Sequence, residues 1–212
     1  MKNKQNDNKK RKDIMQSKSS GKMNAKKIEK GVRLILEGLG ENPQSERLTQ
    51  TPRRAAEMFM EVLSGTHHNP DECLRALTEE RHEEMVILKD IPIYSMCEHH
   101  LLPFSGTASI AYIPQEGKIM GLNTIANLVD ILAKRLQIQE RLTKQIADYL
   151  VKAMSPLGVM VVIKAEHLCM SMRGAKKPGS LTVTSAIRGI FCNTDATRAE
   201  AMSLLMGRES RY

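Results

Sequence analysis

The chain has 212 residues, a formal net charge of +8, 3% aromatic residues and no tryptophan. A chain of this length can bury a substantial core, which Leu, Ile, Val and Met must fill because aromatic residues are few. No apolar run approaches the roughly 18 residues of a membrane span, and the N-terminus has no apolar signal-peptide core. Four cysteines are too few for a disulfide scaffold in a chain this long, so we expect a cytoplasmic protein.

The excess positive charge lies in an N-terminal tail. Residues 1–27 contain ten Lys or Arg and two Asp, and the remainder of the chain is formally neutral. Because the tail is too poor in apolar residues to fold, we predict a disordered basic tail over residues 1–26. A charge confined to a tail does not indicate a nucleic-acid-binding body, so we expect neither a specific nucleic acid nor a membrane as partner.

The first predicted elements are helices. Apolar residues follow helical spacing over residues 27–39. Thr51 offers an N-cap for a second helix, which would begin at Pro52 and end near residue 62. A short helix is predicted over residues 70–77, after which the period of the pattern changes.

The rest of the chain alternates between strand and helix patterns. β-branched and apolar runs predict strands, 3.6-residue periodicity predicts helices, and Asn123 is a plausible N-cap for one of them. The strands are expected at 85–95, 106–114, 157–167 and 180–191, and the helices at 121–137, 140–154 and 196–206. This order indicates an α+β domain with an antiparallel sheet.

Four chemically active side chains are consecutive between the first two predicted strands. Cys97, Glu98, His99 and His100 lie in the segment Tyr94–Phe104, YSMCEHHLLPF. Cys97 and His100 have the residue types and spacing of transition-metal ligands, and a second histidine is suited to carry protons. A lone C-x2-H pattern is weak, because it also occurs where a buried thiol lies near a structural histidine.

A second Cys/His pair could complete a metal site. Cys169 lies beside His167 at the end of an apolar run, which makes it a better candidate for the third ligand than the two other cysteines. Cys97, His100 and Cys169 would give three protein ligands, the number expected when the fourth position is kept for water or substrate. Structural zinc is usually closed by four ligands, so the count favours a catalytic site.

Several long motifs, in order, resemble the GTP cyclohydrolase I family, the zinc enzymes of pterin biosynthesis. The similarity runs from about Lys27 to the C-terminus and includes TPRRAAEMF, SMCEHHLLPFSG, QIQERLTKQIA and HLCMSMRGAKKPGSLTVTS. The resemblance implies hydrolytic opening of the guanine imidazole ring of GTP and rearrangement to 7,8-dihydroneopterin triphosphate with release of formate. That reaction is the first step of tetrahydrofolate biosynthesis.

The resemblance also implies an architecture. Family members have the tunnelling fold, an antiparallel sheet with helices packed on one side, and assemble into a ring-shaped homo-oligomer. The expected ring is a decamer with active sites at subunit interfaces. We accordingly assign residues 27–84 to an N-terminal helical region and residues 85–212 to a catalytic tunnelling-fold domain.

Catalytic roles carry over to the metal motifs. The resemblance implies that Cys97, His100 and Cys169 hold Zn²⁺, which lowers the pKa of water enough to make it a nucleophile. It implies that His167 protonates the purine and that His99 assists proton transfers at C8 and the ribose. Histidines of purely structural role are the competing interpretation.

Guanine recognition is also implied by the resemblance. Glu140 matches the guanine-reading position, with Gln139 beside it, and one carboxylate can accept hydrogen bonds from both N1–H and N2–H₂. Without the family, Glu140 is an ordinary residue for the N-terminal turn of a helix. Specificity for guanine therefore depends on the resemblance.

The phosphate end departs from the family pattern. Arg173 and Arg54 match family positions that contact the triphosphate, the latter from a neighbouring subunit. The family usually carries Lys and Arg where this chain has Thr124 and Asn127, and Asn123 replaces a serine. Neutral contacts bind a triphosphate more weakly than charge-assisted ones, although backbone N–H groups at Asn123 and Thr124 offer some compensation.

Three functions remain in competition. The first is zinc-dependent cyclohydrolase activity on GTP, and the second is the same chemistry on a guanine nucleotide with fewer phosphates. The third is a non-catalytic ring protein that binds a purine or pterin. A zinc nucleobase deaminase is disfavoured because its H-x-E and P-C-x-x-C patterns are absent from the sequence.

Overall fold

The computed structural model describes residues 21–74, 76–77 and 82–207, which divide into two compact units. The first unit ends at Glu61 and the second begins at Val62. Most of the predicted basic tail lies outside the described residues. Among the described residues, no helix is both long and apolar enough to cross a membrane.

The first unit is built from α2 (Ala25–Gly38) and most of α3 (Thr51–Val62). α2 begins after Asn24, whose Oδ1 accepts a hydrogen bond of 3.0 Å from the backbone N–H of Lys27. Such a cap satisfies one of the backbone donors that a helix leaves unpaired at its start. Both helices match the predicted positions to within two residues.

Short elements connect α3 to the main sheet. They are two 3₁₀ turns, η1 (Ser64–His67) and η2 (Pro70–Glu72), followed by β1 (Ala76–Leu77). The prediction of a helix over residues 70–77 is therefore wrong beyond η2. The chain extends there because β1 pairs with β4 (Ile119–Met120), a contact distant in sequence that local pattern does not indicate.

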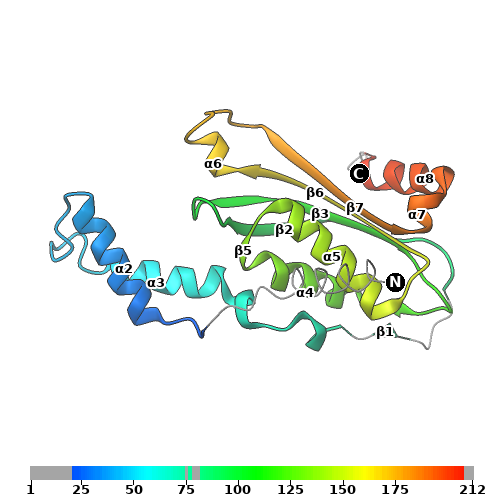
Figure 1. The fold of residues 1–212 in the computed structure, drawn as a ribbon, viewed down its shortest axis with the longest axis horizontal. Coiled ribbons are helices and arrows are strands. Elements are labelled where there is room, and N and C mark those ends of the chain that lie inside the picture. Colours follow the sequence, from blue (N-terminus) through cyan, green and yellow to red (C-terminus); the bar gives the residue numbers. More distant parts are fainter. Residues whose placement is uncertain (1–20, 75, 78–81, 208–212) are drawn as a thin grey trace, which may run out of the picture. The chain divides into compact units, whose positions relative to one another are not determined.

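A five-stranded sheet organises the second unit (Figure 1). Its strand order is β5-β2-β3-β6-β7, in which β2, β3, β6 and β7 form antiparallel pairs and β5 runs parallel to β2. The strands are β2 (Val86–Cys97), β3 (Pro103–Ile113), β5 (Leu136–Gln137), β6 (Gly158–His167) and β7 (Leu181–Gly189). The predicted α+β domain with an antiparallel sheet is confirmed.

One face of the sheet is covered by α4 (Leu122–Ala133) and α5 (Gln139–Met154). α4 has Gly121 at its N-cap and no side-chain cap, so the prediction that Asn123 caps this helix is wrong. Asn123 instead lies inside the first turn. The largest core cluster forms between these helices and alternate strand residues such as Ile110, Val161 and Ile163.

Helices also cover the opposite face, at the end of the sheet away from α6 (Leu168–Ser171) (Figure 1). α7 (Ile190–Asn193) and α8 (Asp195–Met206) pack there against Met160 and Val162. The expectation of helices on one side only is therefore wrong. β6 is apolar on both faces along most of its length, and both faces need cover from water.

Candidate metal centre and nucleotide site

The metal motif occupies the turn between β2 and β3. Cys97 is the last residue of β2, and its backbone N–H donates to Leu102 O at 2.9 Å. Leu101, with a positive φ of 53°, closes the turn by donating to Cys97 O at 2.9 Å. The adjoining N–H of Glu98 donates to Gln137 O on β5 at 3.0 Å. Hydrogen bonds from two neighbouring strands therefore hold this turn, which positions its side chains.

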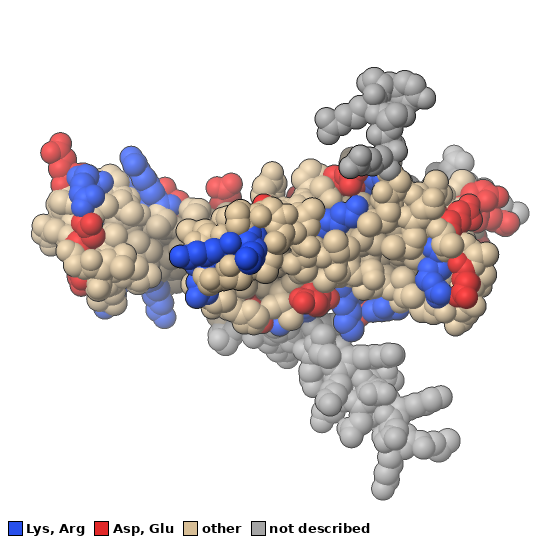
Figure 2. All heavy atoms as spheres, turned by 90° about the horizontal axis from the view of Figure 1, so that it is seen from above, with Lys and Arg blue, Asp and Glu red and all other residues tan. Residues whose placement is uncertain are grey.

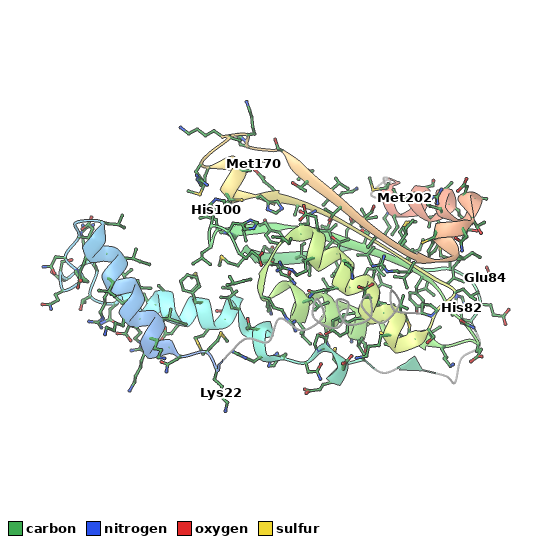
Figure 3. The ribbon with its side chains drawn as sticks, viewed as in Figure 1. Lys22, His82, Glu84, His100, Met170 and Met202 are labelled. Atoms are coloured by element: carbon green, nitrogen blue, oxygen red, sulfur yellow. The ribbon has the colours of Figure 1, made fainter. Side chains whose placement is uncertain are left out.

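Cys97 and His100 meet Cys169, as the sequence predicts. One ligand atom from each residue lies within 4.8 Å of the other two. Cys169 reaches this position from α6, which follows β6 directly. Figure 3 shows His100 and Met170, a residue of α6, at the same end of the sheet. Among the described residues, this is the one group of three or more His, Cys, Asp or Glu side chains that could hold a metal ion.

The chemistry of this group fits a divalent metal with thiolate and imidazole ligands. Burial raises the pKa of the Cys169 thiol, and the nearby Cys97 raises it further. Two thiolates this close repel each other, and a bound cation would remove that penalty. Cys97 is buried whereas His100 is exposed, so the group is anchored on one side and accessible from the other. Zn²⁺ accepts this ligand combination.

His167, the last residue of β6, has its ring fixed by two contacts. The ring stacks on Phe104, its cross-strand neighbour on β3, at 4.5 Å between centroids and 10° between planes. Its Nε2 lies 2.8 Å from Gln139 Oε1 at the start of α5. Burial lowers the pKa of His167, and the negative charge of Glu140 partly opposes this shift.

Gln139 determines which nitrogen of His167 carries the hydrogen. Its Nε2 lies 3.0 Å from Ile163 O, 3.0 Å from Thr182 O and 3.1 Å from Thr184 Oγ1, all of which accept hydrogen bonds. The amide NH₂ must face these acceptors, so the carbonyl oxygen faces the imidazole. His167 therefore donates from Nε2–H, which leaves Nδ1 available for proton exchange.

Gln139 and Glu140 differ sharply in environment although they are adjacent. Gln139 is 1% exposed, and both polar groups of its side chain are engaged by the protein. Glu140 is exposed in the first turn of α5, where a ligand could reach its carboxylate. Successive helix residues point about 100° apart, which explains how one faces the sheet and the other faces solvent.

An ion pair that was not predicted from the sequence joins the β2–β3 turn to α5. Arg141 donates to both carboxylate oxygens of Glu98, at 2.5 and 2.9 Å. This contact lowers the pKa of Glu98. The side chain of His99, the other histidine of the motif, is more exposed than that of Glu98. Its Nδ1 lies 3.9 Å from Cys97 Sγ, and its Nε2 lies 3.9 Å from Glu98 Oε1.

The predicted phosphate contacts lie on separate elements. Asn123 and Thr124 are in the first turn of α4, and Arg173 is exposed in the connection after α6. Arg54 lies in the first turn of α3, within the first unit. Figure 2 shows Lys and Arg side chains gathered over the connection between α6 and β7, where the exposed cations are Arg173, Lys176 and Lys177.

A sequence model of GTP cyclohydrolase I matches residues 28–206, which is most of the chain. The chain belongs to the GTP cyclohydrolase I family. It is 59% identical to GTP cyclohydrolase 1 of Pelotomaculum thermopropionicum over 182 residues, which cover 86% of this chain and 97% of that relative. It is also 59% identical to GTP cyclohydrolase 1 of Carboxydothermus hydrogenoformans over 179 residues, which cover 84% of this chain and 93% of the relative.

The same name belongs to a further relative in Bacillus cytotoxicus, which is 52% identical over 187 residues covering 88% of this chain and 99% of the relative. These relatives match over nearly their whole length, and the residues that match the family model belong to both units of the chain. The mixed α+β architecture with a curled sheet is consistent with the tunnelling fold of that family. The Cys97, His100 and Cys169 group is likewise consistent with its dependence on a metal.

Proposed function

We propose that this chain is a zinc-dependent GTP cyclohydrolase I that opens the guanine imidazole ring of GTP and releases formate. The observation that carries the proposal is the meeting of Cys97, His100 and Cys169 beside His167 in a member of this family. The product is 7,8-dihydroneopterin triphosphate, formed after the opened ring is rebuilt with ribose carbons. This is the first step of pterin and folate synthesis.

Cys97, His100 and Cys169 would hold Zn²⁺ in this enzyme. When bound, the ion supplies a water molecule of lowered pKa for attack near neutral pH. The protein contributes two thiols, of which that of Cys97 is buried, and an accessible imidazole. The hydrogen bonds of the β2–β3 turn keep two of these ligands in place before the metal arrives.

His167 is the proposed general acid toward the purine. Its Nε2–H is committed to Gln139, so the proton that it delivers leaves from Nδ1. Burial lowers the pKa of His167, which makes the protonated ring a stronger acid. Stacking on Phe104 fixes the plane of the ring, and the Gln139 contact fixes its orientation within that plane.

His99 and Glu140 have the remaining proposed roles at the guanosine moiety. His99 lies one residue from His100, and its exposed ring can exchange protons with solvent and with substrate atoms near C8. The Glu140 carboxylate can accept two hydrogen bonds from the guanine edge. The pair between Glu98 and Arg141 holds the metal turn against the helix that carries Glu140.

The proposed working form is a ring-shaped homo-oligomer, a decamer as in the family. β7 is an edge strand of the sheet, and its apolar side chains Leu181 and Val183 are 62% and 53% exposed. An unpaired edge with exposed apolar residues is a liability that assembly with a second subunit would remove. Arg54 would then approach the phosphates from a neighbouring subunit.

A formate-release assay on zinc-loaded protein tests the proposal directly. GTP, GDP, GMP and guanosine are compared in parallel, and pterin formation is followed by fluorescence after oxidation. Turnover of GTP that requires zinc is the expected result. Absence of turnover with all four compounds by zinc-loaded, folded protein would refute the enzymatic function.

A substrate with fewer phosphates is the second candidate, and the composition of α4 favours it. Asp130 is the one charged residue in this helix, and neither Thr124 nor Asn127 offers a cation to a phosphate. GTP carries more negative charge than GDP or GMP and depends most on such cations. A kcat/KM for GDP or GMP above that for GTP in the same assay would establish this preference.

A further inference from the structure

The connection between β6 and β7 carries two functional residues, and beyond α6 it is exposed. It spans residues 168–180 and includes Cys169 and Arg173. Every residue from 172 to 179 is exposed. Its conformation therefore depends on a small number of hydrogen bonds rather than on packing.

Glu166 supplies two of those hydrogen bonds from one oxygen atom. Its Oε1 accepts from Ser171 Oγ at 2.6 Å and from the backbone N–H of Gly179 at 3.0 Å. Ser171 ends α6, and Gly179 lies two residues before β7. A single carboxylate thus holds both sides of the connection. These two hydrogen bonds lower the pKa of Glu166.

The other hydrogen bonds of the connection do not reach both of its ends. Ser171 Oγ also lies 3.1 Å from His167 O, and backbone bonds within the connection include Lys177 N–H to Met170 O at 3.1 Å. Gly174, Lys176 and Gly179 have positive φ values of 61°, 50° and 76°. Lys176 adopts a conformation that is unfavourable for a residue with a side chain, so the surroundings must hold it.

Glu166 acts from the side of the sheet opposite His167. Successive strand residues point to opposite faces, so the side chain of Glu166 does not approach the ring of His167 stacked on Phe104. Glu166 nevertheless lies three residues before Cys169, and its partner Ser171 lies two residues after it. The two hydrogen bonds therefore bracket the metal ligand along the chain.

We propose that Glu166 is a positioning residue whose carboxylate fixes the β6–β7 connection, and with it Cys169 for the metal and Arg173 for the phosphates. This inference rests on the proposed function for the roles of Cys169 and Arg173. The geometry of the connection itself does not depend on that function. Loss of the carboxylate frees both ends of the connection and weakens metal retention.

The test compares Glu166→Ala with Glu166→Gln in the full-length protein. One oxygen accepts both bonds, so the glutamine amide oxygen can take its place, and Glu166→Gln should retain zinc like the wild type. Glu166→Ala should bind zinc about 10- to 100-fold more weakly in competition with a chelator, the range typical of residues that orient metal ligands. Glu116→Ala is the matched control, because that carboxylate pairs with Lys118 in an exposed turn distant in sequence from the site.

Hydrogen exchange of residues 168–180 gives a readout that needs neither metal nor substrate. We expect faster exchange there in Glu166→Ala and unchanged exchange in Glu166→Gln and Glu116→Ala. If Glu166→Ala fails to fold, Ser171→Ala removes one of the two Glu166 bonds, together with the contact between Ser171 Oγ and His167 O, and should still protect the connection better than Glu166→Ala because the bond to Gly179 remains. Zinc affinity and hydrogen exchange like those of the wild type in the alanine variant would overturn the proposal, as would a glutamine variant as impaired as the alanine variant.

Failure of the proposed enzymatic function would give different results from failure of the proposed role of Glu166. Wild-type protein that binds zinc but turns over no guanine nucleotide would refute the enzymatic function and leave the role of Glu166 intact. Wild-type protein that binds no zinc would also refute that function, and hydrogen exchange of the connection would still decide whether Glu166 holds it.

Discussion

Replacement of Gln139 by methionine, compared with a control that keeps the hydrogen bond to His167, separates the orientation of His167 from the stability of the fold. Methionine has a similar shape but neither donates nor accepts as an amide does. Gln139→Met removes the bond to His167 Nε2 and the bonds that two amide hydrogens make with Ile163 O, Thr182 O and Thr184 Oγ1. Three effective hydrogen bonds at roughly 0.5–1.5 kcal/mol each predict a loss of about 2–4 kcal/mol in the free energy of unfolding.

The catalytic effect should exceed what this loss of stability explains. Phe104 still stacks on the ring of His167, but nothing then selects which nitrogen faces the substrate. A general acid contributes about 10²–10⁴ in rate, so partial loss of its orientation should lower kcat by about 10- to 100-fold. Zinc content should be unchanged, because the hydrogen-bond partners of the Gln139 side chain do not include Cys97, His100 or Cys169.

Thr184→Val provides the matched control. It removes one acceptor of the Gln139 amide and the contact with Thr143 but keeps the hydrogen bond to His167. It should lower the thermal unfolding midpoint and leave kcat within about twofold of the wild type, since buried hydrogen bonds contribute to stability wherever they lie. A kcat for Gln139→Met equal to that of Thr184→Val would refute the orienting role of Gln139.

Other predictions concern the metal, the ion pair and the phosphates. Cys169→Ala should abolish stoichiometric zinc binding and formate release, whereas Cys192→Ala should change neither, as measured by metal analysis and the formate assay. The pKa of Glu98 is lowered in the folded state. The contribution of Glu98 to the free energy of unfolding is therefore present above its ordinary pKa and is lost as the pH falls through its pKa in the folded protein. Glu98→Gln should therefore lower stability by about 1 kcal/mol at pH 7 and much less at pH 3 in denaturant titrations. Thr124→Lys combined with Asn127→Arg should lower the KM for GTP at least tenfold with little change in kcat, and an unchanged KM would show that these positions do not contact phosphate.

The group of Cys97, His100 and Cys169 could be predicted because its chemistry is visible locally. Cys97 and His100 are three residues apart in a turn, and Cys169 follows a strand beside a second histidine. Sequence alone shows such clusters, and the antiparallel register of β2, β3 and β6 then brings the two motifs to one end of the sheet. The ligand group is the part of the site for which prediction and structure agree most closely.

The features that sequence did not indicate depend on contacts across the fold. Gln139 was assigned to the substrate by resemblance, but its burial follows from the rotation of α5 against the sheet. The pair between Glu98 and Arg141 joins two elements that are distant in the chain. β1 forms a strand only because β4 lies beside it, and α8 packs on the face of the sheet that was expected to carry no helices. Each outcome was decided by tertiary contacts rather than by local preference.

The position of the three ligands across the sheet sets an order of events during folding. Cys97 ends β2 and Cys169 follows β6, with β3 between these two strands. The complete ligand set therefore does not exist until both antiparallel pairings have formed, and chain closure over such a separation is slow compared with local turn formation. We expect zinc to be captured tightly only late in refolding, so the rate of zinc uptake would time the completion of the β2–β3–β6 sheet.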